Sequence, residues 1–361
     1  MIRCNVAVTG LNAADDPAPG IAVIRSIRDS GQWEGKIIGL AYDALDTGIY
    51  DDSLADEVYL IPYPFDSVGL LERLKQISRK TKIDVLMPLL DMELLNLPGL
   101  VPWLEELGIN SLLPTMSRVR LQLKLNLAEF CLKSDIRYPK QIAINSPTMI
   151  AITIKTLGLP VVVKGIIHGA HLASTVEEAS AHFNAIQKRW GLPVILQEYI
   201  EGEEYNTDCL TDRNGEIVGA VSMRKLGITD RGKAWSGVTV KDEGLLKLSE
   251  DILHKVNWVG PVELEFVKQR RSDSYYLLEI NPRFGTWIFL TAHAGQNLPL
   301  AAIRVAMGEK LGRLPPYQAG VMFVRHSRDV ICPVDCLASL TMSGELALNE
   351  IKKGVKEPCL T

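Results

Sequence analysis

Residues 275–283 read Tyr-Tyr-Leu-Leu-Glu-Ile-Asn-Pro-Arg, and residues 262–266 read Val-Glu-Leu-Glu-Phe. Both runs have the length and apolar content of β-strands, and the polar residues 270–274 between them predict a turn. We therefore expect the two strands to be antiparallel neighbours in one sheet. Because residues two apart on a strand face the same side, the acidic residues within each run share a face.

This strand pair carries a set of oxygen donors. Glu263 and Glu265 share one side of the first strand, and Glu279 and Asn281 share one side of the second. Two carboxylates and an amide oxygen meeting there would suit magnesium. The alternative is a solvated strand face, but Glu279 lies within an apolar run, where an unpaired charge is costly. Arg283 follows at the strand end, where a guanidinium can hold a phosphate oxygen.

A second pattern lies upstream. The strand expected over residues 194–200 is followed by Glu-Gly-Glu-Glu at 201–204. A strand edge with main-chain donors and acceptors beside apolar side chains suits an adenine ring, and a nearby carboxylate can accept from ribose hydroxyls. Alone, the same residues describe an ordinary strand and turn.

The first part of the chain alternates strand and helix patterns. Short strands are expected near residues 5–8, 36–40, 56–60 and 83–87, with helices from Pro19 and over 68–80. Such a βα repeat predicts a parallel sheet. It lacks a G-x-G-x-x-G fingerprint, so a dinucleotide fold is not indicated. Thr9, Gly10, Pro88 and Asp91 fall at the carboxyl ends of strands, where ligands of such sheets usually bind; turn chemistry alone is the alternative.

Beyond residue 114 the pattern changes. We expect one long helix over 117–134, a strand over 159–164 that ends in Lys164, a helix over 176–190, and a hairpin at Asn214-Gly215. The final part is expected to hold a strand at 321–325 and a helix at 333–340.

Two local patterns are misleading. Residues 227–233 match most of a phosphate-binding loop, but Ala234 stands where a hydroxyl residue is needed and no strand-to-helix context is expected. Cys332 and Cys336 have no second cysteine pair to complete a zinc site.

Composition excludes several classes. Lys plus Arg is 39 and Asp plus Glu is 43, giving a formal net charge of −4, which argues against a broad nucleic-acid surface. No run reaches the roughly 18 apolar residues of a membrane helix. The N-terminus reads as a first strand, and the six scattered cysteines as reduced thiols, so we expect a cytoplasmic protein with no membrane partner.

The order of these elements resembles the ATP-grasp superfamily, in the branch similar to carbamoyl-phosphate synthase large-subunit modules and carboxylate–amine ligases. The elements are Lys164, residues 197–205, Glu265 and the Glu-Ile-Asn-Pro-Arg of 279–283. The resemblance covers nearly all of the chain. It implies an α/β and α+β architecture, in which a pre-ATP-grasp parallel α/β domain precedes a two-lobed ATP-grasp fold. The implied divisions are 1–115 for the first domain, 116–195 and 196–310 for the two lobes, and 311–361 for a C-terminal extension.

The resemblance also implies roles for individual residues. Lys124 and Lys164 would bind the phosphates of ATP. The adenine would lie on residues Gln197, Glu198, Tyr199 and Ile200, and the ribose on Glu204. Glu265, Glu279 and Asn281 would hold Mg²⁺, with Mn²⁺ as an alternative. Arg283 would hold the transferring phosphoryl group or the acyl-phosphate, and Arg224 and Arg231 would face an acceptor carboxylate.

One departure concerns the loop 165–171, which in the family is rich in glycine and serine. Here it contains His168 and His171, which either add phosphate contacts or pack. The lysines are also expected to differ: Lys164 ends a buried strand and is rigid and dry, whereas Lys124 on its helix is expected to be mobile.

The implied activity is an ATP-dependent ligase that joins a small-molecule carboxylic acid to an amine through an acyl-phosphate, releasing ADP and phosphate. The alternatives are a bicarbonate-activating enzyme like carbamoyl-phosphate synthase or biotin carboxylase, and a nucleotide-binding regulatory protein without turnover. A homodimer is expected from the resemblance alone.

Overall fold

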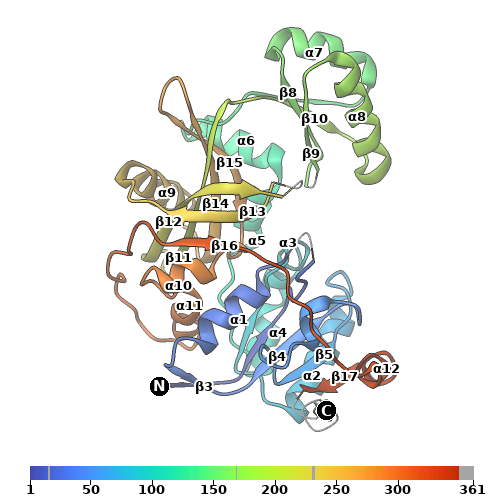
Figure 1. The fold of residues 1–361 in the computed structure, drawn as a ribbon, viewed down its shortest axis with the longest axis vertical. Helices are drawn as coiled ribbons and strands as arrows, with labels where there is room; N and C mark the ends of the chain where they lie inside the picture. The colour runs from blue at the N-terminus through green and yellow to red at the C-terminus, as the bar shows by residue number, and fades with distance from the viewer. Residues whose placement is uncertain (15–16, 168, 230–231, 349–361) are drawn as a thin grey trace, which may run out of the picture.

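A computed structural model describes residues 1–14, 17–167, 169–229 and 232–348. Figure 1 shows three parts along the long axis of the molecule: a five-stranded sheet at the bottom, a six-stranded sheet in the middle and a four-stranded sheet at the top. Within the described ranges, no helix combines the length and apolarity needed to cross a bilayer.

The N-terminal domain contains the predicted parallel sheet. Its strand order is β17-β5-β4-β2-β6, and β2, β4, β5 and β6 pair in parallel. These strands are β2 (Val6–Val8), β4 (Ile37–Ala41), β5 (Glu57–Leu60) and β6 (Val85–Met87). The helices of this part are α1 (Gly20–Arg28), α2 (Ser67–Lys80), α3 (Asp91–Leu94) and α4 (Val101–Glu106), with 3-10 turns η1 (Thr47–Tyr50) and η2 (Leu97–Leu100) and the small pair β1 (Ile2–Arg3) and β3 (Trp33–Glu34). The predicted βα repeat is confirmed.

The single long helix predicted over 117–134 is wrong. The segment contains α5 (Met116–Val119), the 3-10 turn η3 (Arg120–Gln122) and α6 (Lys124–Lys133). Leu123 breaks the helix because its backbone is extended, with φ −76° and ψ 120°. The break turns the chain so that Lys124 begins α6 and its Nζ donates to the carbonyl of Ile167 in another part of the chain, 2.8 Å away.

A four-stranded antiparallel sheet forms the upper lobe. Its order is β7-β10-β8-β9, from β7 (Gln141–Ile144), β8 (Val161–Lys164), β9 (Ala170–Ala173) and β10 (Val194–Glu198). The 3-10 turn η4 (Pro147–Met149) leads into α7 (Ile150–Leu157), and α8 (Val176–Trp190) begins after Thr175, whose side chain accepts from the backbone N–H of Glu178. The apolar sides of α7 and α8 pack on the sheet around the fully buried Phe183.

The six-stranded sheet joins the predicted strand pair to the rest of the chain. Its order is β15-β14-β11-β12-β13-β16, all antiparallel. The strands are β11 (Gly202–Thr211), β12 (Ile217–Ile228), β13 (Ala234–Thr239), β14 (Gly260–Gln269), β15 (Tyr275–Asn281) and β16 (Met322–Val324). One face packs against residues of α6 and α9 (Glu243–Val256) in a core with Trp258 and Phe266. Near the other face lie α10 (Phe289–His293) and α11 (Leu298–Ala306), which also contact α1.

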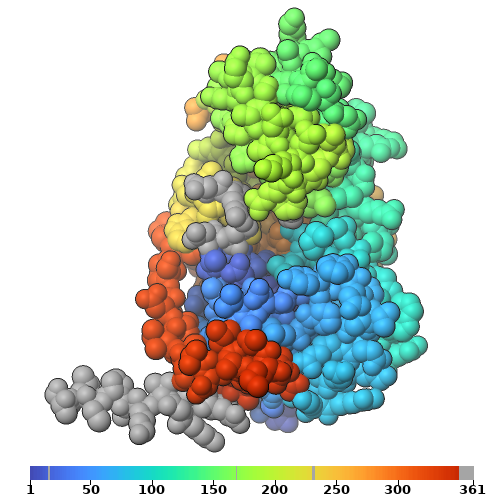
Figure 2. Space-filling view, turned by 90° about the vertical axis from the view of Figure 1, so that its right-hand side faces the viewer, coloured from blue at the N-terminus to red at the C-terminus, as the bar shows by residue number. Residues whose placement is uncertain are grey.

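The last described segment connects two sheets. After β16, α12 (Val334–Ser343) and β17 (Glu345–Ala347) follow, and β17 pairs antiparallel with β5. The strand and helix predicted for this segment are therefore confirmed. Figure 2 shows these residues, in red, lying against the blue N-terminal domain. Arg73 of α2 fixes the contact by donating to the carbonyl of Gly344 and pairing with Glu345.

A buried carboxyl group closes the carboxyl end of the N-terminal sheet. Glu93 is fully buried in α3, and its oxygens accept from the hydroxyls of Thr9 and Tyr42, each at 2.7 Å. The backbone N–H groups of Leu89 and Leu90 also donate to it. Burial outweighs these hydrogen bonds and raises the pKa of Glu93 to about 7.

We predict that Glu93 makes the stability of the chain pH-dependent. A carboxyl whose pKa is higher in the folded than in the unfolded state loses stability as pH rises from its ordinary value of 4.5 towards 7. The expected loss is about 3 kcal/mol. Between pH 5 and pH 8, the free energy of unfolding measured in urea should fall by about 2.5 kcal/mol less in Glu93→Gln than in the unmodified chain. The exposed Glu72→Gln serves as the control, and an unchanged difference in Glu93→Gln would contradict the assignment.

Candidate active site

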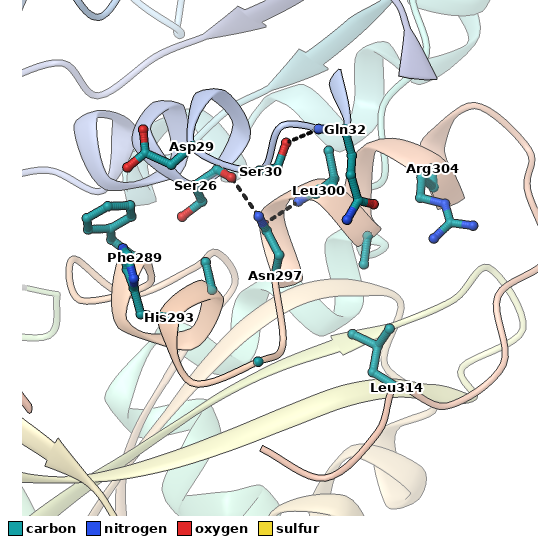
Figure 3. A pocket seen from close by; sticks show the side chains of 13 residues that line it. Ser26, Asp29, Ser30, Gln32, Phe289, His293, Asn297, Leu300, Arg304 and Leu314 are labelled. Atoms are coloured by element: carbon teal, nitrogen blue, oxygen red, sulfur yellow. Dashed lines mark hydrogen bonds between the residues drawn. The ribbon is translucent and has the colours of Figure 1, made fainter. Parts of the chain in front are cut away.

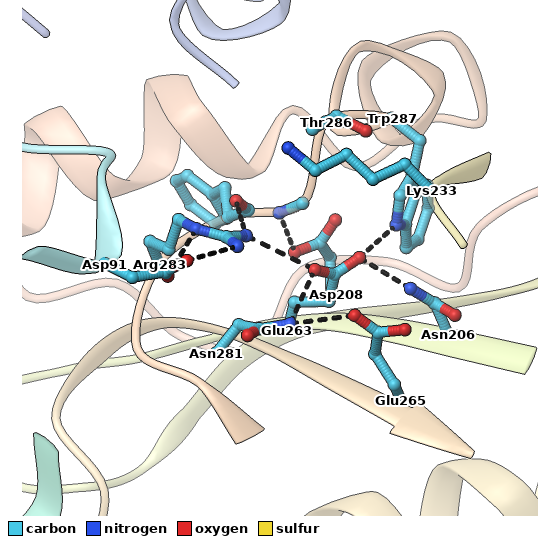
Figure 4. Close-up of polar contacts among 12 residues, drawn as sticks. Asp91, Asn206, Asp208, Lys233, Glu263, Glu265, Asn281, Arg283, Thr286 and Trp287 are labelled. Carbon is cyan, nitrogen blue, oxygen red and sulfur yellow. Dashed lines mark hydrogen bonds and ion pairs between the residues drawn. The ribbon is translucent and has the colours of Figure 1, made fainter. Parts of the chain in front are cut away.

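The predicted oxygen donors meet on one face of the six-stranded sheet. Glu265 lies directly opposite Glu279, and Glu263 directly opposite Asn281, across the β14–β15 pair. Opposite residues of an antiparallel pair have Cβ atoms about 5 Å apart on the same face. Figure 4 shows Glu263, Glu265 and Asn281 gathered above these strands. The pairing expected from the sequence is confirmed.

Glu263 is the centre of this network, a position that the sequence did not reveal. Its carboxylate accepts from the side-chain amides of Asn206 at 2.6 Å and Asn281 at 3.1 Å, and from the indole N–H of Trp287 at 2.8 Å. Asn281 also donates to Glu265 at 2.9 Å. The alternation in residues 262–266 gives the face of Glu263, but its partners come from three other elements.

Arg283 links the sheet to the N-terminal domain. Its Nε lies 2.8 Å from Asp91 Oδ1, and its Nη1 donates to Glu263 at 3.4 Å. Although burial opposes its charge, Asp91 and Glu263 raise the pKa of this buried guanidinium. Asp91 begins α3 after β6, at the carboxyl end of the parallel sheet where the sequence placed it. The guanidinium is thereby held in one place at the end of β15.

Two lysines, Lys124 of α6 and Lys164 of β8, compensate the charge of Glu279. Lys124 Nζ lies 3.1 Å from Glu279 Oε1. Burial alone would raise the pKa of Glu279, but Lys124 and Lys164 outweigh it and lower the pKa to about 2. Burial, reinforced by the charge of Lys124, lowers the pKa of Lys164 to about 8, against the attraction of Glu279.

The expectation that Lys124 is mobile is wrong. Lys124 and Lys164 are 4% and 6% exposed, so both are buried to the same degree. The ammonium of Lys124 is fixed by Glu279 and by the carbonyl of Ile167, in the loop between β8 and β9. The helix break at Leu123, which the sequence did not reveal, puts Lys124 there.

Lys225 is a further cation that the sequence analysis missed. Its Nζ donates to Glu204 at 2.8 Å and to Glu265 at 3.0 Å, and its side chain is 4% exposed. Although burial opposes its charge, Glu265 and Glu204 raise the pKa of Lys225. Burial, together with Glu263 and Glu279, raises the pKa of Glu265 against the effect of Lys225. Strand alternation from Met223 was the available signal, since it places residue 225 on this face.

The structure does not bring Arg224 to this face. Arg224 pairs with Tyr205 on β11, one position out of phase with Lys225, and its guanidinium lies 3.3 Å from Glu203 on the opposite side of the sheet. It is 39% exposed there. Its predicted contact with an acceptor carboxylate gains no support from this position. Arg231, predicted for the same role, and His168 lie outside the described residues.

The predicted adenine segment connects two sheets. Gln197 is buried and its Nε2 lies 3.3 Å from Gln141 Oε1. Glu198 pairs with Val161 on β8, and its backbone N–H donates to the carbonyl of Lys140. Strand β10 is thus an interior strand up to Glu198, and the predicted edge begins only at Tyr199 and Ile200. Tyr199 is half-exposed.

The donor chemistry of the face suits a hard cation. Its ligand atoms are carboxylate and amide oxygens, and Asn206 Oδ1 is buried without a hydrogen-bond partner. Across the described ranges, no group of three or more His, Cys, Asp or Glu residues is arranged to hold a metal ion. The predicted magnesium ligands include only two residues of these types, Glu265 and Glu279, and the third oxygen comes from Asn281. Burial, and then the nearby Glu263, raise the pKa of Asp208, whose Oδ2 has no hydrogen-bond partner among the described residues.

The misleading loop is not a phosphate-binding loop. The segment 227–233 begins within β12 and is followed by β13, which pairs antiparallel with β12, so the chain here does not pass from a strand into a helix. Lys233 donates to the carbonyl of Pro17 in the N-terminal domain. None of the five cysteines in the described part of the chain forms a disulfide.

Two cavities lie beside the N-terminal domain. The smaller has a volume of about 370 Å³ and lies between α1 and α11, lined by Ser26, Asn297 and Arg304 (Figure 3). The larger has a volume of about 1140 Å³ and is bounded by α1, residues 286–293 and residues 321–332. Trp287 lines the larger cavity and donates to Glu263, so this cavity adjoins the carboxylate face.

Comparisons with known proteins agree with this architecture. The model of a family described as "ATP-grasp in the biosynthetic pathway with Ter operon" matches residues 192–328. The carbamoyl phosphate synthase large chain of Thermoanaerobacter pseudethanolicus is 25% identical over 183 residues, which are 48% of this chain and 17% of that protein. The D-alanine–D-alanine ligase of Rickettsia typhi is 27% identical over 145 residues, 35% of this chain and 43% of that one. This chain thus matches less than half the length of either relative.

Among solved structures, the biotin carboxylase domain of Hydrogenobacter thermophilus 2-oxoglutarate carboxylase superposes with a TM-score of 0.65 at 19% identity, covering 87% of this chain and 71% of that one. It was solved in complex with MgADP, ADP and bicarbonate. The resemblance predicted from the sequence is confirmed: residues 192–328 match an ATP-grasp family model, and the chain has the α/β architecture that the resemblance implied.

We predict that the neighbours Arg224 and Lys225 differ sharply in their effect on stability. Lys225→Met leaves two carboxylates uncompensated and should lower the free energy of unfolding by about 2–3 kcal/mol, discounted for their partial exposure. Arg224→Ala breaks only an exposed pair and should cost less than about 1 kcal/mol. Urea unfolding measures both, and Lys225→Met with Glu265→Gln should regain part of the loss. Equal losses in the two single variants would refute the described placement.

Proposed function

We propose that the chain is an ATP-dependent ligase that joins a carboxylic acid to an amine through an acyl-phosphate and releases ADP and phosphate. One observation supports this proposal most strongly. Glu265, Glu279 and Asn281 lie on one face of the sheet, close to two buried lysines, Lys124 and Lys164, and to a fixed arginine, Arg283. This charge distribution is the one that phosphoryl transfer requires.

Each part of the site has a place in binding ATP. Lys124 and Lys164 bind the phosphates, and Arg283 holds the transferring group. Gln197, Glu198, Tyr199 and Ile200 bind adenine at the hinge between β10 and β11, and Glu204 binds the ribose. Lys225 holds Glu204 and Glu265 in position through its two hydrogen bonds.

Glu265, Glu279 and Asn281 would hold Mg²⁺, or Mn²⁺ in its place, which neutralises phosphate charge when bound. Before that cation arrives, Lys124 and Lys225 compensate the two carboxylates. Both lysines can then turn to the phosphates or to the ribose side without leaving a carboxylate unpaired.

The chemistry needs positioning and little else from the protein. A carboxylate oxygen of the acid attacks the γ-phosphorus, the bond to the bridging oxygen breaks, and ADP leaves. The amine nitrogen then attacks the acyl carbon, a C–N bond forms, and inorganic phosphate departs as the amine loses a proton. The buried cations stabilise the charge that develops in the first step.

A second candidate activates bicarbonate. The biotin carboxylase domain that resembles this chain was solved with bicarbonate, which favours this alternative. The large cavity beside the site favours the first candidate, because 1140 Å³ is far more than bicarbonate occupies. For either candidate we propose small-molecule substrates, a cytoplasmic location and a homodimer, with no nucleic acid and no membrane as partners.

The first test concerns the metal ligands. Glu279→Gln should abolish ADP formation from ATP while thermal melting shows that the fold survives, because the amide cannot replace the charge. Glu203→Gln, on the opposite face of the same sheet, is the matched control and should retain activity. ADP release is measured with amino-acid and dipeptide pools and, separately, with bicarbonate. Turnover with bicarbonate alone would favour the second candidate, and ATP binding without any turnover would reject both.

The second test compares the lysines. Because both are buried and compensate one carboxylate, Lys124→Met should slow single-turnover ADP formation as strongly as Lys164→Met, by at least about a hundredfold. The exposed Lys133→Met, at the other end of α6, is the control. Calorimetric ATP binding separates affinity from chemistry. A Lys124→Met variant that loses affinity but keeps its rate would show that only Lys164 acts on the transferring group.

A further inference from the structure

The larger cavity contains an arginine that forms no ion pair with the described residues. Arg325 lines it, next to the end of β16. Its Nη2 donates to the carbonyl of Thr286 at 2.8 Å, but its buried Nη1 has no hydrogen-bond partner among the described residues. No carboxylate in the described part of the chain pairs with Arg325, and burial lowers its pKa. A buried guanidinium donor left unsatisfied is costly unless a ligand completes it.

The guanidinium is held in one orientation. Its carbon lies 5.8 Å from the ring centre of Trp235 and 5.9 Å from that of Phe323, and its backbone N–H donates to the carbonyl of Trp235. Such aromatic contacts fix a guanidinium without neutralising it. The unsatisfied Nη1 is therefore a preformed donor.

The walls around Arg325 are largely apolar. Ile21 of α1, Leu54, Trp287 and Leu290 line the same cavity. Its outer wall is the segment 321–332, which Arg328 ties to Asp51 of the N-terminal domain at 3.7 Å. That pair neutralises Arg328, whereas Arg325 stays uncompensated. A large, mostly apolar cavity with a fixed cation in its wall favours a ligand that is apolar with one anionic end.

We propose that this cavity binds the organic-acid substrate, an acid with an aryl or alkyl body, and that Arg325 pairs with a carboxylate of that acid. The inference rests on the proposed function and names its substrate class. It also gives a role to the segment 321–332, which supplies both the cation and the outer wall. Arg325 is then a specificity-determining residue that lies outside the ATP-binding elements.

Binding without ATP tests the pocket separately from catalysis. The probes are 3-phenylpropionate, its neutral amide and 2-phenylethylphosphonate, titrated by calorimetry and ligand-observed NMR. The acid should bind about ten- to a hundredfold more tightly than the amide, the range expected for a charged hydrogen bond. Arg325→Ala should remove that preference, and Arg325→Lys should keep part of it. Arg189→Ala, which removes another arginine stacked on a tryptophan, should change nothing.

Several results would overturn the proposal. They are equal binding of acid and amide, acid binding that survives in a folded Arg325→Ala variant, and no binding of the acid at millimolar concentration. Much tighter binding of the phosphonate than of the acid would show that the ligand carries a phosphate ester and not a carboxylate. Thermal melting and ATP binding confirm that each variant is folded. If the acid binds as expected but no amine pool supports ADP release, the proposed function fails while the pocket assignment stands.

Discussion

Charge compensation across chain segments is the constraint on which this site depends. Four carboxylates stand close together, fully or partly shielded from water, and leaving any of them unpaired there would carry a free-energy penalty. Each is compensated by a group from elsewhere in the chain: Glu279 by Lys124 of α6, Glu265 by Lys225 of β12, and Glu263 and Asp91 by Arg283. The carboxylates thus define where the surrounding elements must lie.

The same pairs fix the parts of the molecule relative to one another. Asp91 comes from the N-terminal domain and Arg283 from the six-stranded sheet, while Lys124 stands where α6 meets the loop between β8 and β9. A ligand carrying several negative charges competes for the same cations. Its binding therefore acts on contacts between segments as well as on local side chains, which is how a site of this kind couples occupancy to the positions of its lobes.

Much of this arrangement was predictable from the sequence because it follows from strand periodicity. The face of Glu265, Glu279 and Asn281, the parallel N-terminal sheet and the place of Asp91 all follow from alternation and order along the chain. The position of Lys124 was not predictable, since the helix breaks at Leu123 although leucine has a high helix propensity. The sequence analysis predicted Arg224 for the site and missed Lys225, because a shift of one residue along a strand moves a side chain to the opposite face of the sheet. The sequence did not indicate Arg325 as a site residue, because its neighbours Trp235 and Thr286 are distant in sequence.

The pairing of β17 with β5 has a consequence for how the molecule is made. The edge of the N-terminal sheet is covered by a strand that lies nearly the whole length of the chain away. During synthesis that edge stays open until the four- and six-stranded sheets have emerged from the ribosome. An open edge strand is a template for pairing with other chains. The N-terminal domain therefore depends on the last described residues for protection, and non-local closure of this kind slows folding.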